Sequence, residues 1–208
     1  MSSILVLNSS VYGDASATRQ LVAETVAKLK AASPGVTVVE RDLGSDPIPH
    51  LTTANLAGIR GTPTTPEELE ARALSDRLIA ELKAADTLVI GSPMYNFSIS
   101  TGLRAWFDWV LRAGETFRYT QDGPQGLVGS KRVIILEARG GLYSEGPTAS
   151  FDYQEPYLRH LLWFIGLTDV TFVHAEKLGY GPEVRESAIH HALARIADVV
   201  ARPAAELA

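Results

Sequence analysis

Short apolar runs alternate with longer amphipathic stretches along the whole chain. The short runs are rich in β-branched residues and predict five strands, at Ile4–Leu7, Val36–Val39, Leu88–Gly91, Val133–Leu136 and Val170–His174. The longer stretches predict helices at about Arg19–Ala31, Pro66–Ala84, Thr101–Arg112, Pro156–Gly166 and Glu183–Ala201. This alternation is typical of βαβ units. We therefore expect an α/β fold with a doubly wound five-stranded parallel sheet, in the order 2-1-3-4-5, and helices on both faces.

The helix predicted at Pro66–Ala84 has the clearest start signal. Thr65 stands at the N-cap, Pro66 at the first helical position and Glu68 three residues after the cap, which together form a capping box. The stripe expected to face the sheet consists of Leu69, Ala73, Leu78 and Leu82. Right-handed crossovers leave a crevice at the carboxyl ends of the first, third and fourth strands, and we expect the functional site there.

Two segments do not fit plain crossovers. Residues Asp46–Thr64 are rich in Pro, Thr and Gly and predict an excursion with at most one short helix, at Thr53–Ile59. Residues Phe117–Val128 contain Gly123-Pro124 and predict a small hairpin or flap. Both segments are candidates for the rim of a pocket.

Composition narrows the class of protein. The chain has 208 residues, of which 46% are hydrophobic and 21% charged, so one domain spanning residues 1–208 is expected. The net charge of −5 and the lack of a basic cluster make nucleic acid a poor partner. There is no cysteine, so any redox chemistry must come from a bound cofactor. The apolar run at the N-terminus is too short for a secretory signal and no stretch is long enough for a membrane span, which favours a cytoplasmic location.

The stretch Ser92–Ser98 carries the strongest functional signal. It follows the third predicted strand and contains Met94, Tyr95, Asn96 and Phe97. Apolar faces next to backbone amides are what a flat, amphipathic ring such as a flavin requires. The alternative is that these side chains are ordinary core residues, although core packing does not usually place three of them at the end of a strand.

The loop after the first strand predicts an anion site. It offers the hydroxyls of Ser9, Ser10, Ser16 and Thr18, and a helix begins directly after it. Backbone N–H groups at a helix N-terminus bind phosphate, so this loop is a phosphate cradle without a cationic side chain. It is not a Walker loop, because the lysine pattern is missing. The alternative is that Ser16 or Thr18 only caps the helix.

The fourth predicted strand ends in Glu137-Ala138-Arg139-Gly140-Gly141. Paired glycines let the backbone approach a planar ligand closely, and exposed amides there suit the pyrimidine edge of a flavin. Taken alone, the two glycines are weak evidence for a ligand and are more typical of a simple turn. However, all three candidate loops follow strands that border the expected crevice, and this coincidence favours a ligand site.

Other chemistries lack their residue patterns. The five histidines show no metal-ligand spacing, so no metal is predicted. There is no Gly-x-Ser-x-Gly elbow, and a Gly-x-Gly-x-x-Gly fingerprint is absent after the first strand, so a pyridine nucleotide is expected to come and go as a substrate. No side chain is assigned a catalytic role, because the chemistry is expected to take place on the cofactor.

A set of motifs resembles a known family. The set comprises Ser92–Phe97, Ile99–Leu103, Arg112–Gly114, Thr116–Tyr119, Gly123-Pro124, Gly126-Leu127, Arg139–Gly141, Gly146-Pro147 and Tyr180–Glu183. Together these residues are similar to the FMN-dependent NADH azoreductases, also called NADH:quinone oxidoreductases, which have a flavodoxin-like fold. The resemblance runs from Leu5 to about Glu183 and implies FMN as the cofactor.

The resemblance also implies site residues. Ser10, Ser16, Ala17 and Thr18 would hold the FMN phosphate, Met94, Tyr95, Asn96 and Phe97 would contact the ring, and Ala138, Arg139, Gly140 and Gly141 would line its pyrimidine side. Ala17-Thr18 replaces a more polar pair, and Ala138 stands where serine is common, so backbone bonds rather than side-chain bonds are expected at these positions. The stretch Ala149–Glu155 is longer than usual in the family, which points to a reshaped pocket mouth.

The family is homodimeric, with the flavin near the subunit boundary. Phe151, Tyr153 and Trp163 are therefore candidates for shaping the neighbouring subunit's site, with core packing as the alternative. Tyr119 is a candidate substrate contact, and Arg60 is a candidate for a nucleotide phosphate, with solvation as its alternative. NADH or NADPH would reduce the flavin, and a quinone or azo compound would then take its place and accept two electrons, which predicts ping-pong kinetics.

Two other functions use the same features. A flavodoxin-like electron carrier would bind FMN without turning over an organic substrate, although such carriers usually lack a flap like Phe117–Val128. A phosphodiester hydrolase would use the same anion cradle, but no metal-ligand set or activated nucleophile supports it. Oxidation of NADH in the presence of a quinone distinguishes the oxidoreductase from the electron carrier. Phosphodiester cleavage by cofactor-free protein would favour the hydrolase.

Overall fold

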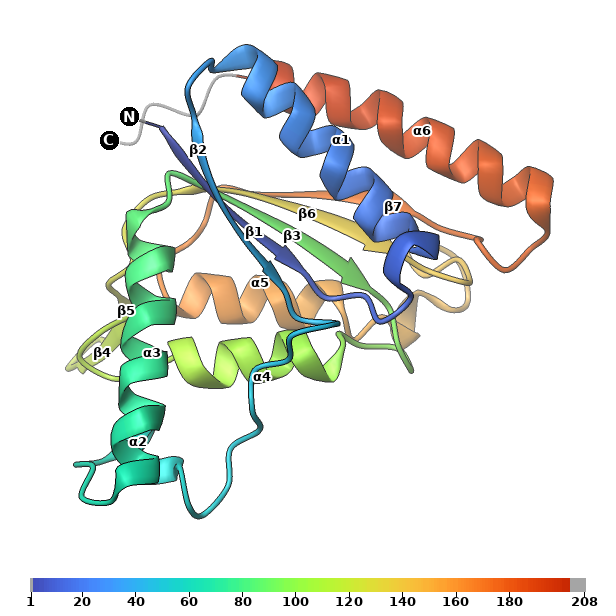
Figure 1. Cartoon of the computed structure of the whole chain (residues 1–208). Helices are drawn as coiled ribbons and strands as arrows, with labels where there is room; N and C mark the ends of the chain where they lie inside the picture. Colours follow the sequence, from blue (N-terminus) through green and yellow to red (C-terminus); the bar gives the residue numbers. More distant parts are fainter. Residues whose placement is uncertain (1, 203–208) are drawn as a thin grey trace.

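A five-stranded parallel sheet forms the centre of the molecule, in the order β2-β1-β3-β6-β7 (Figure 1). The computed structural model describes residues 2–202. The strands of the sheet are β1 (Ser3–Asn8), β2 (Thr37–Asp42), β3 (Thr87–Pro93), β6 (Arg132–Ala138) and β7 (Val170–Ala175). The separate two-stranded sheet is an antiparallel hairpin of β4 (Phe117–Thr120) and β5 (Gly123–Gly126). The predicted α/β fold and strand order are confirmed.

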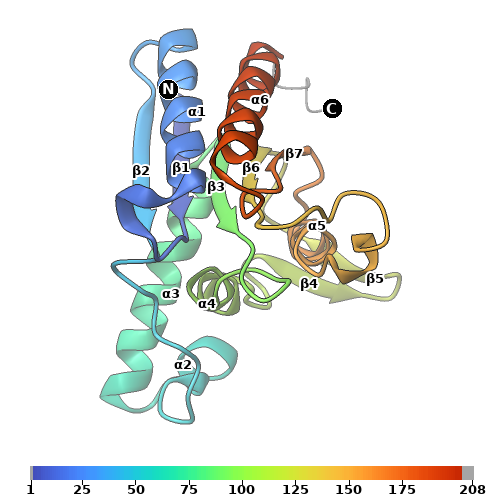
Figure 2. The ribbon, with the colours of Figure 1, turned by 90° about the vertical axis from the view of Figure 1, so that its right-hand side faces the viewer.

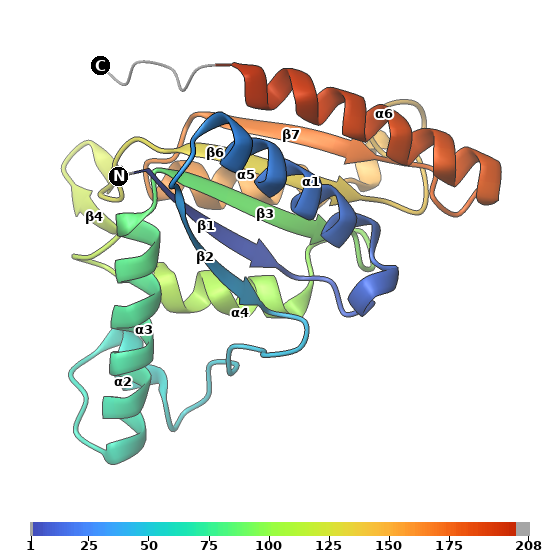
Figure 3. The same cartoon turned by 45° about the horizontal axis from the view of Figure 1, so that its top comes forward.

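Helices cover both faces of the sheet. Figure 1 shows α1 (Ala17–Ala32) and α6 (Pro182–Ala201) on one face, and α3 (Pro66–Ala84), α4 (Thr101–Val110) and α5 (Glu155–Phe164) on the other. Figures 1 and 3 show that α1 and α6 both begin at the edge where the strand arrows end. Short helical turns lie at η1 (Gly13–Ala15), α2 (Leu56–Arg60) and η2 (Ala149–Phe151). No helix within residues 2–202 is long and apolar enough to cross a membrane.

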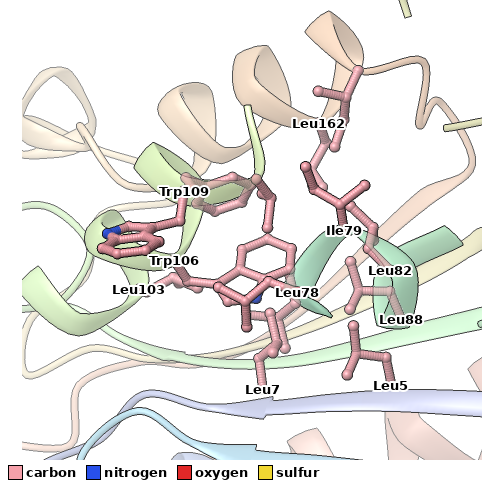
Figure 4. Packing of buried hydrophobic residues seen from close by; sticks show 14 of the residues in the cluster. Leu5, Leu7, Leu78, Ile79, Leu82, Leu88, Leu103, Trp106, Trp109 and Leu162 are labelled. Carbon is pink, nitrogen blue, oxygen red and sulfur yellow. The ribbon is translucent and has the colours of Figure 1, made fainter. Parts of the chain in front are cut away.

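Alternation along each strand builds two hydrophobic cores. Val89 packs with α1 and α6, whereas its neighbours Leu88 and Ile90 face the opposite side. Side chains in a strand point to alternate faces, so a continuous apolar run in a parallel sheet fills both layers. The core under α3 and α4 contains Trp106 and Leu78 (Figure 4). A sheet buried on both sides leaves only its edges and strand ends for a ligand.

The expected elements agree with the structure except for their boundaries and one stripe. The capping box at Thr65 and Glu68 is present, and the predicted hairpin is formed. The buried side of α3 consists of Ala71, Ser75, Leu78, Ile79 and Leu82. Leu69 and Ala73 are exposed, so that part of the predicted stripe was wrong. The difference arises because Ser75 is buried through a hydrogen bond of its hydroxyl to Trp109 O (2.8 Å), which a purely apolar pattern misses.

The excursion and the hairpin lie away from the carboxyl ends of the strands. The helix α2, smaller than the predicted Thr53–Ile59 and shifted, packs on α3. Figures 1 and 3 place both α2 and the β4–β5 hairpin toward the opposite side of the molecule from the strand arrowheads. Arg60 lines a hollow of about 300 Å³ there, together with Arg72 and Arg112. The excursion therefore rims a different pocket from the expected crevice.

Candidate functional site

A cavity of about 340 Å³ lies at the carboxyl ends of β1, β3 and β6. Its walls contain eight of the predicted cofactor residues: Ser10, Ser16, Ala17, Met94, Tyr95, Ala138, Arg139 and Gly140. A hollow of about 420 Å³ near Ser3 and Asp86 is larger, but it lies at the amino ends of the strands and contains none of the predicted residues. The crevice expected from the strand order is therefore where the candidate chemistry gathers.

Hydroxyls and backbone donors meet at the start of α1. Ser16 caps the helix, because its Oγ accepts a hydrogen bond from Arg19 N–H (3.2 Å), and it lies 3.0 Å from Thr18 Oγ1. The N–H groups of Ala17 and Thr18 are in the first turn of the helix, where no carbonyl of the same helix can accept from them. The capping role and the anion-binding role are thus compatible at this loop.

Tyr95 ties the first loop to the loop after β3. Its hydroxyl lies 3.2 Å from Ser10 Oγ and accepts a hydrogen bond from Val11 N–H (3.2 Å). Gly44 supports the same loop from behind, since a Cβ at that position would lie 2.1 Å from Ser10 O. The Ser10 loop of the cradle is therefore held in place by the loops after β2 and β3.

A strained turn follows β3. Tyr95 N–H donates to Ser98 O (2.9 Å) and Ser98 N–H donates to Tyr95 O (3.1 Å), which closes a two-residue hairpin over Asn96 and Phe97. The φ angles are +48° at Asn96 and +72° at Phe97. Positive φ at both central positions gives a type I′ turn, in which glycine is favoured at the position that Phe97 occupies. A bulky residue in this conformation costs about 1–3 kcal/mol and is most often found at functional sites.

The loop after β6 presents backbone donors to the cavity. Ala138 O accepts from Met94 N–H (2.9 Å), and the carbonyls of Gly140 and Gly141 accept from the loop after β7. Within residues 2–202, no hydrogen bond is recorded for the N–H groups of Gly140 and Gly141. A Cβ at Gly140 would meet no atom within 4 Å, so there is open space for a ligand against this backbone.

A buried ionic network lies behind the same loop. Arg139 is fully buried, and its Nη2 contacts Glu137 (2.5 Å) and Asp152 (3.0 Å), while Nη1 contacts Glu176 (3.2 Å). His174 Nε2 lies 2.8 Å from Glu155 Oε2 and 3.1 Å from Glu137 Oε2. Because the guanidinium and the imidazole fill the space between the carboxylates, the group forms ion pairs rather than an open metal site.

Comparisons with known proteins identify the family. A model of the flavodoxin-like fold matches residues 2–200. A protein of Hyphomonas neptunium, an FMN-dependent NADH:quinone oxidoreductase, is 64% identical over 199 residues, which cover 96% of each chain. This chain belongs to the FMN-dependent NADH:quinone oxidoreductases. The family resemblance stated from the sequence is therefore confirmed.

Solved structures of azoreductases share the fold. The crystal structure of an azoreductase from Bacillus anthracis is 33% identical, with a TM-score of 0.88, and covers 96% of this chain and 99% of that one. An FMN-dependent NADH-azoreductase from the same organism, solved in complex with FMN, has a TM-score of 0.85 at 24% identity over 96% of this chain and all of that one. At that identity, the second likeness shows the fold alone.

Three of the predicted substrate residues lie outside the cavity wall of this chain. Tyr119 lies on β4, Trp163 on α5 and Arg60 on α2, and none of them lines the cavity. Arg60 donates to the carbonyls of Leu111 (2.6 Å) and Asp108 (3.5 Å). Their roles toward substrate stay predictions.

Aromatic side chains surround the turn at Phe97. Phe97 itself is 47% exposed, and its ring packs edge-on against Tyr143 and Phe151 at centroid distances of 6.1 and 6.2 Å. Tyr153 N–H donates to Phe97 O (3.1 Å), and Ser98 Oγ donates to Tyr153 O (3.3 Å). The long stretch Ala149–Glu155 thus packs directly on the strained turn.

Sequence reasoning missed part of the cavity wall. The additional lining residues are Tyr12, Ala15, Pro93, Leu178 and Arg185. Arg185 is the notable one, because it stands in the first turns of α6, and α6 begins beside α1 (Figure 2). The predicted cradle without a cationic side chain was therefore incomplete. The missing information was the packing of α6 along α1, which no local motif shows.

The residues present fit a phosphorylated flavin. The cavity offers unused backbone donors at α1 and at Gly140-Gly141, hydroxyls at Ser10 and Ser16, and open space at Gly140. The donors and hydroxyls at the start of α1 suit a charged phosphate, and the donors at Gly140-Gly141 suit the polar edge of a flat ring. The donor set contains no thiolate, and within residues 2–202 no side chain of the cavity forms an activated nucleophile with a neighbouring base.

Proposed function

We propose that this chain is an FMN-dependent enzyme that takes two electrons from NADH and gives them to quinones or azo compounds. The observation that carries the proposal is the cavity at the ends of β1, β3 and β6, where phosphate donors, an aromatic turn and free ring-edge donors lie together. Family membership supports the same reaction. We regard residues 1–208 as one catalytic domain and keep a cytoplasmic location as a prediction, testable by cell fractionation.

Each loop has a separate task in holding the cofactor. Ser10, Ser16 and the N–H groups of Ala17 and Thr18 bind the phosphate, and Arg185 adds a positive charge beside them. We expect Met94 and Tyr95, which line the cavity, to contact the ring, together with Asn96 and Phe97 in the turn beside them. The N–H groups of Gly140, in the cavity wall, and of its neighbour Gly141 would bind the pyrimidine edge. FMN, when bound, supplies the two-electron chemistry.

The protons of the reaction come partly from the donor. NADH delivers a hydride, which is two electrons and one proton, whereas reduction of a quinone to a quinol needs two electrons and two protons. The second proton is taken from solvent, since no side chain in the cavity wall among residues 2–202 is an evident general acid. Because NADH and the acceptor would use the same cavity in turn, we expect ping-pong kinetics.

We further propose that the active form is a homodimer. Tyr119, Phe151 and Trp163 are 73%, 49% and 52% exposed, which is unusual for aromatic side chains unless a partner covers them. The subunit boundary expected for the family would bring such residues near the neighbouring cavity. Sedimentation analysis tests the oligomeric state, and a mixed dimer of a Tyr119→Ala chain with a Thr18→Val chain tests whether one subunit completes the other's site.

The colour of the purified protein tests the function. A yellow sample that NADH bleaches and menadione restores supports the oxidoreductase. A yellow sample that NADH does not bleach would favour the electron carrier instead. A colourless protein that takes up no FMN and cleaves a phosphodiester would favour the hydrolase. NADPH in place of NADH, at equal concentration, resolves the preference for the donor.

A further inference from the structure

The ionic network around Arg139 has no part in the function proposed above, yet it lies directly behind the cavity. Arg139 lines the cavity wall, and its Nε donates to Gln154 Oε1 (3.1 Å). Gln154 in turn donates from Nε2 to Ser92 O (2.9 Å) at the end of β3. Arg139 and Gln154 are fully buried. Charge in this network acts on the cavity through protein rather than water, so it is weakly screened.

The network holds more negative than positive groups. Its carboxylates are Glu137 on β6, Asp152 and Glu155 around the start of α5, and Glu176 after β7, and its cations are Arg139, Arg159 and His174. Among these, His174 is the group whose ordinary pKa lies nearest neutral pH, while burial raises the pKa of Glu137 above its usual range. With His174 protonated, the carboxylates exceed the cations by one, and with His174 neutral they exceed them by two.

The surroundings of His174 decide its charge. Glu137 faces His174 from β6, Glu155 faces it from α5, and the Phe172 ring stacks on it at 6.2 Å. Burial alone would lower the pKa of His174, and the nearby positive charge of Arg139 also opposes its protonation and lowers its pKa. Hydrogen bonds to Glu137 and Glu155 outweigh both effects and raise the pKa to about 9. The bond from His174 lowers the pKa of Glu155 to about 2. At neutral pH, His174 therefore carries a positive charge and Glu155 a negative one.

We propose that His174 tunes the reduction potential of the flavin in the cavity, by keeping one positive charge behind the loop after β6. Reduced flavin is the more electron-rich form, so a positive charge nearby favours it and an extra negative charge disfavours it. His174 acts through Glu137 and Arg139. It is a positioning residue that supplies positive charge behind the cavity and touches neither cofactor nor substrate. The inference rests on the proposed function, because it requires FMN in this cavity.

The midpoint potential of the FMN-loaded protein at pH 7 tests the proposal. In His174→Gln, we expect the ratio of reduced to oxidised FMN at a fixed poise to fall about tenfold, which is about 30 mV for a two-electron couple. His174→Lys restores a positive charge at a partly exposed position and should return the ratio to near that of wild type. His190→Gln, a histidine on the exposed side of α6, is the matched control and should leave the potential unchanged.

A substitution of the opposite sign separates charge from disturbance. Glu155→Gln removes a carboxylate that is ionised at neutral pH, so it should raise the potential, and it is best measured at pH 6, where His174 stays protonated. The difference in midpoint potential between wild type and His174→Gln should disappear as the pH rises through about 9. His174→Lys, which keeps its positive charge, should retain a higher potential than His174→Gln at that pH. A merely structural role would move both variants in the same direction.

The outcomes are distinguishable from failure of the proposed function. If wild type retains no FMN, the proposed function fails and no potential can be measured. If wild type retains FMN but His174→Gln has an unchanged potential, or Glu155→Gln shifts it in the same direction as His174→Gln, the tuning role is overturned. If His174→Gln loses FMN, Glu155→Gln decides, and a potential that does not rise overturns the proposal.

Discussion

The two ends of the cavity handle charge in different ways. At the start of α1, hydroxyls and N–H groups of Ser10, Ser16 and Thr18 provide neutral donors, and Arg185 is the one cation in the cavity wall whose side chain forms no recorded ion pair within residues 2–202. Behind the loop after β6, the buried Arg139 lies among the buried Glu137 and the partly buried Asp152 and Glu176. A phosphate brings its own charge and needs directed donors, whereas a nearly neutral ring is influenced by fixed charges that the protein supplies.

The largest effect is expected from a substitution at the charged end of the cavity, behind the loop after β6. Arg139→Met removes the buried cation that Glu137, Asp152 and Glu176 share, and it leaves the fully buried Glu137 without its nearest partner. Breaking a buried pair in this way costs about 3–5 kcal/mol, so we expect the free energy of unfolding, measured with urea, to fall by that amount. Arg159→Met is the matched control at an exposed position, where the loss should stay below about 1 kcal/mol. Equal losses in the two variants would contradict a buried network.

The neutral end is tested by removing a single hydroxyl. Thr18→Val keeps the shape of a buried residue but deletes a hydroxyl 3.0 Å from Ser16 Oγ. A hydrogen bond to a charged group contributes about 1.5–3 kcal/mol, so FMN affinity should fall about 10- to 100-fold. Riboflavin, which lacks the phosphate, should bind the variant and wild type equally, as measured by flavin fluorescence. A matching loss for riboflavin would mean that Thr18 supports the ring or the fold instead.

The pH dependence of stability sharpens the contrast. The folded-state pKa of His174, about 9, lies above its ordinary value of 6.5. The stability that protonated His174 contributes is therefore fully present below about pH 6.5 and is lost as the pH rises through 9. We expect wild type to exceed His174→Gln by about 2 kcal/mol at pH 6, allowing for partial exposure, and by much less at pH 10. A constant difference across this range would show that the proton of His174 is not involved.

The smallest expected effect on stability is at Phe97. Phe97→Gly relieves the left-handed conformation but removes the contacts with Tyr143 and Phe151, so the free energy of unfolding should change by less than about 1 kcal/mol. NADH-dependent reduction of menadione should fall clearly at the same time, because the strained aromatic side chain serves the site. Ser187→Gly, on the exposed surface of α6, controls for the added glycine. A large loss of stability would indicate that Phe97 is mainly a packing residue.

The sequence predicts the features that depend on local patterns better than those that depend on long-range packing. Alternation around Leu88–Gly91 and the capping box at Thr65 are local patterns, so strands, helices and strand order follow from them. The loops at Ser16 and Gly140 were predicted because each contains a local motif directly after a strand whose place in the sheet was also predicted. Arg185 and His174 were not, because their roles depend on which helix or strand packs beside them. Long-range packing of charged residues leaves no periodic signal.

The stretch Ala149–Glu155 illustrates the same limit. The sequence predicted a reshaped pocket mouth there, but it did not show which residues the stretch contacts. In the structure, its residues Asp152 and Gln154 bind Arg139, and Tyr153 binds the backbone of Phe97. The stretch thus connects the charged network with the strained turn, and its contribution is to support both loops of the cavity.

Equilibrium binding of FMN and of riboflavin to the cofactor-free protein tests the central claim most directly. If the cavity at the ends of β1, β3 and β6 is built for a phosphorylated flavin, FMN should bind at least about 100-fold more tightly than riboflavin, since the phosphate alone gains several charged hydrogen bonds. Equal affinity for the two flavins, or no retention of FMN after dialysis, would contradict the account.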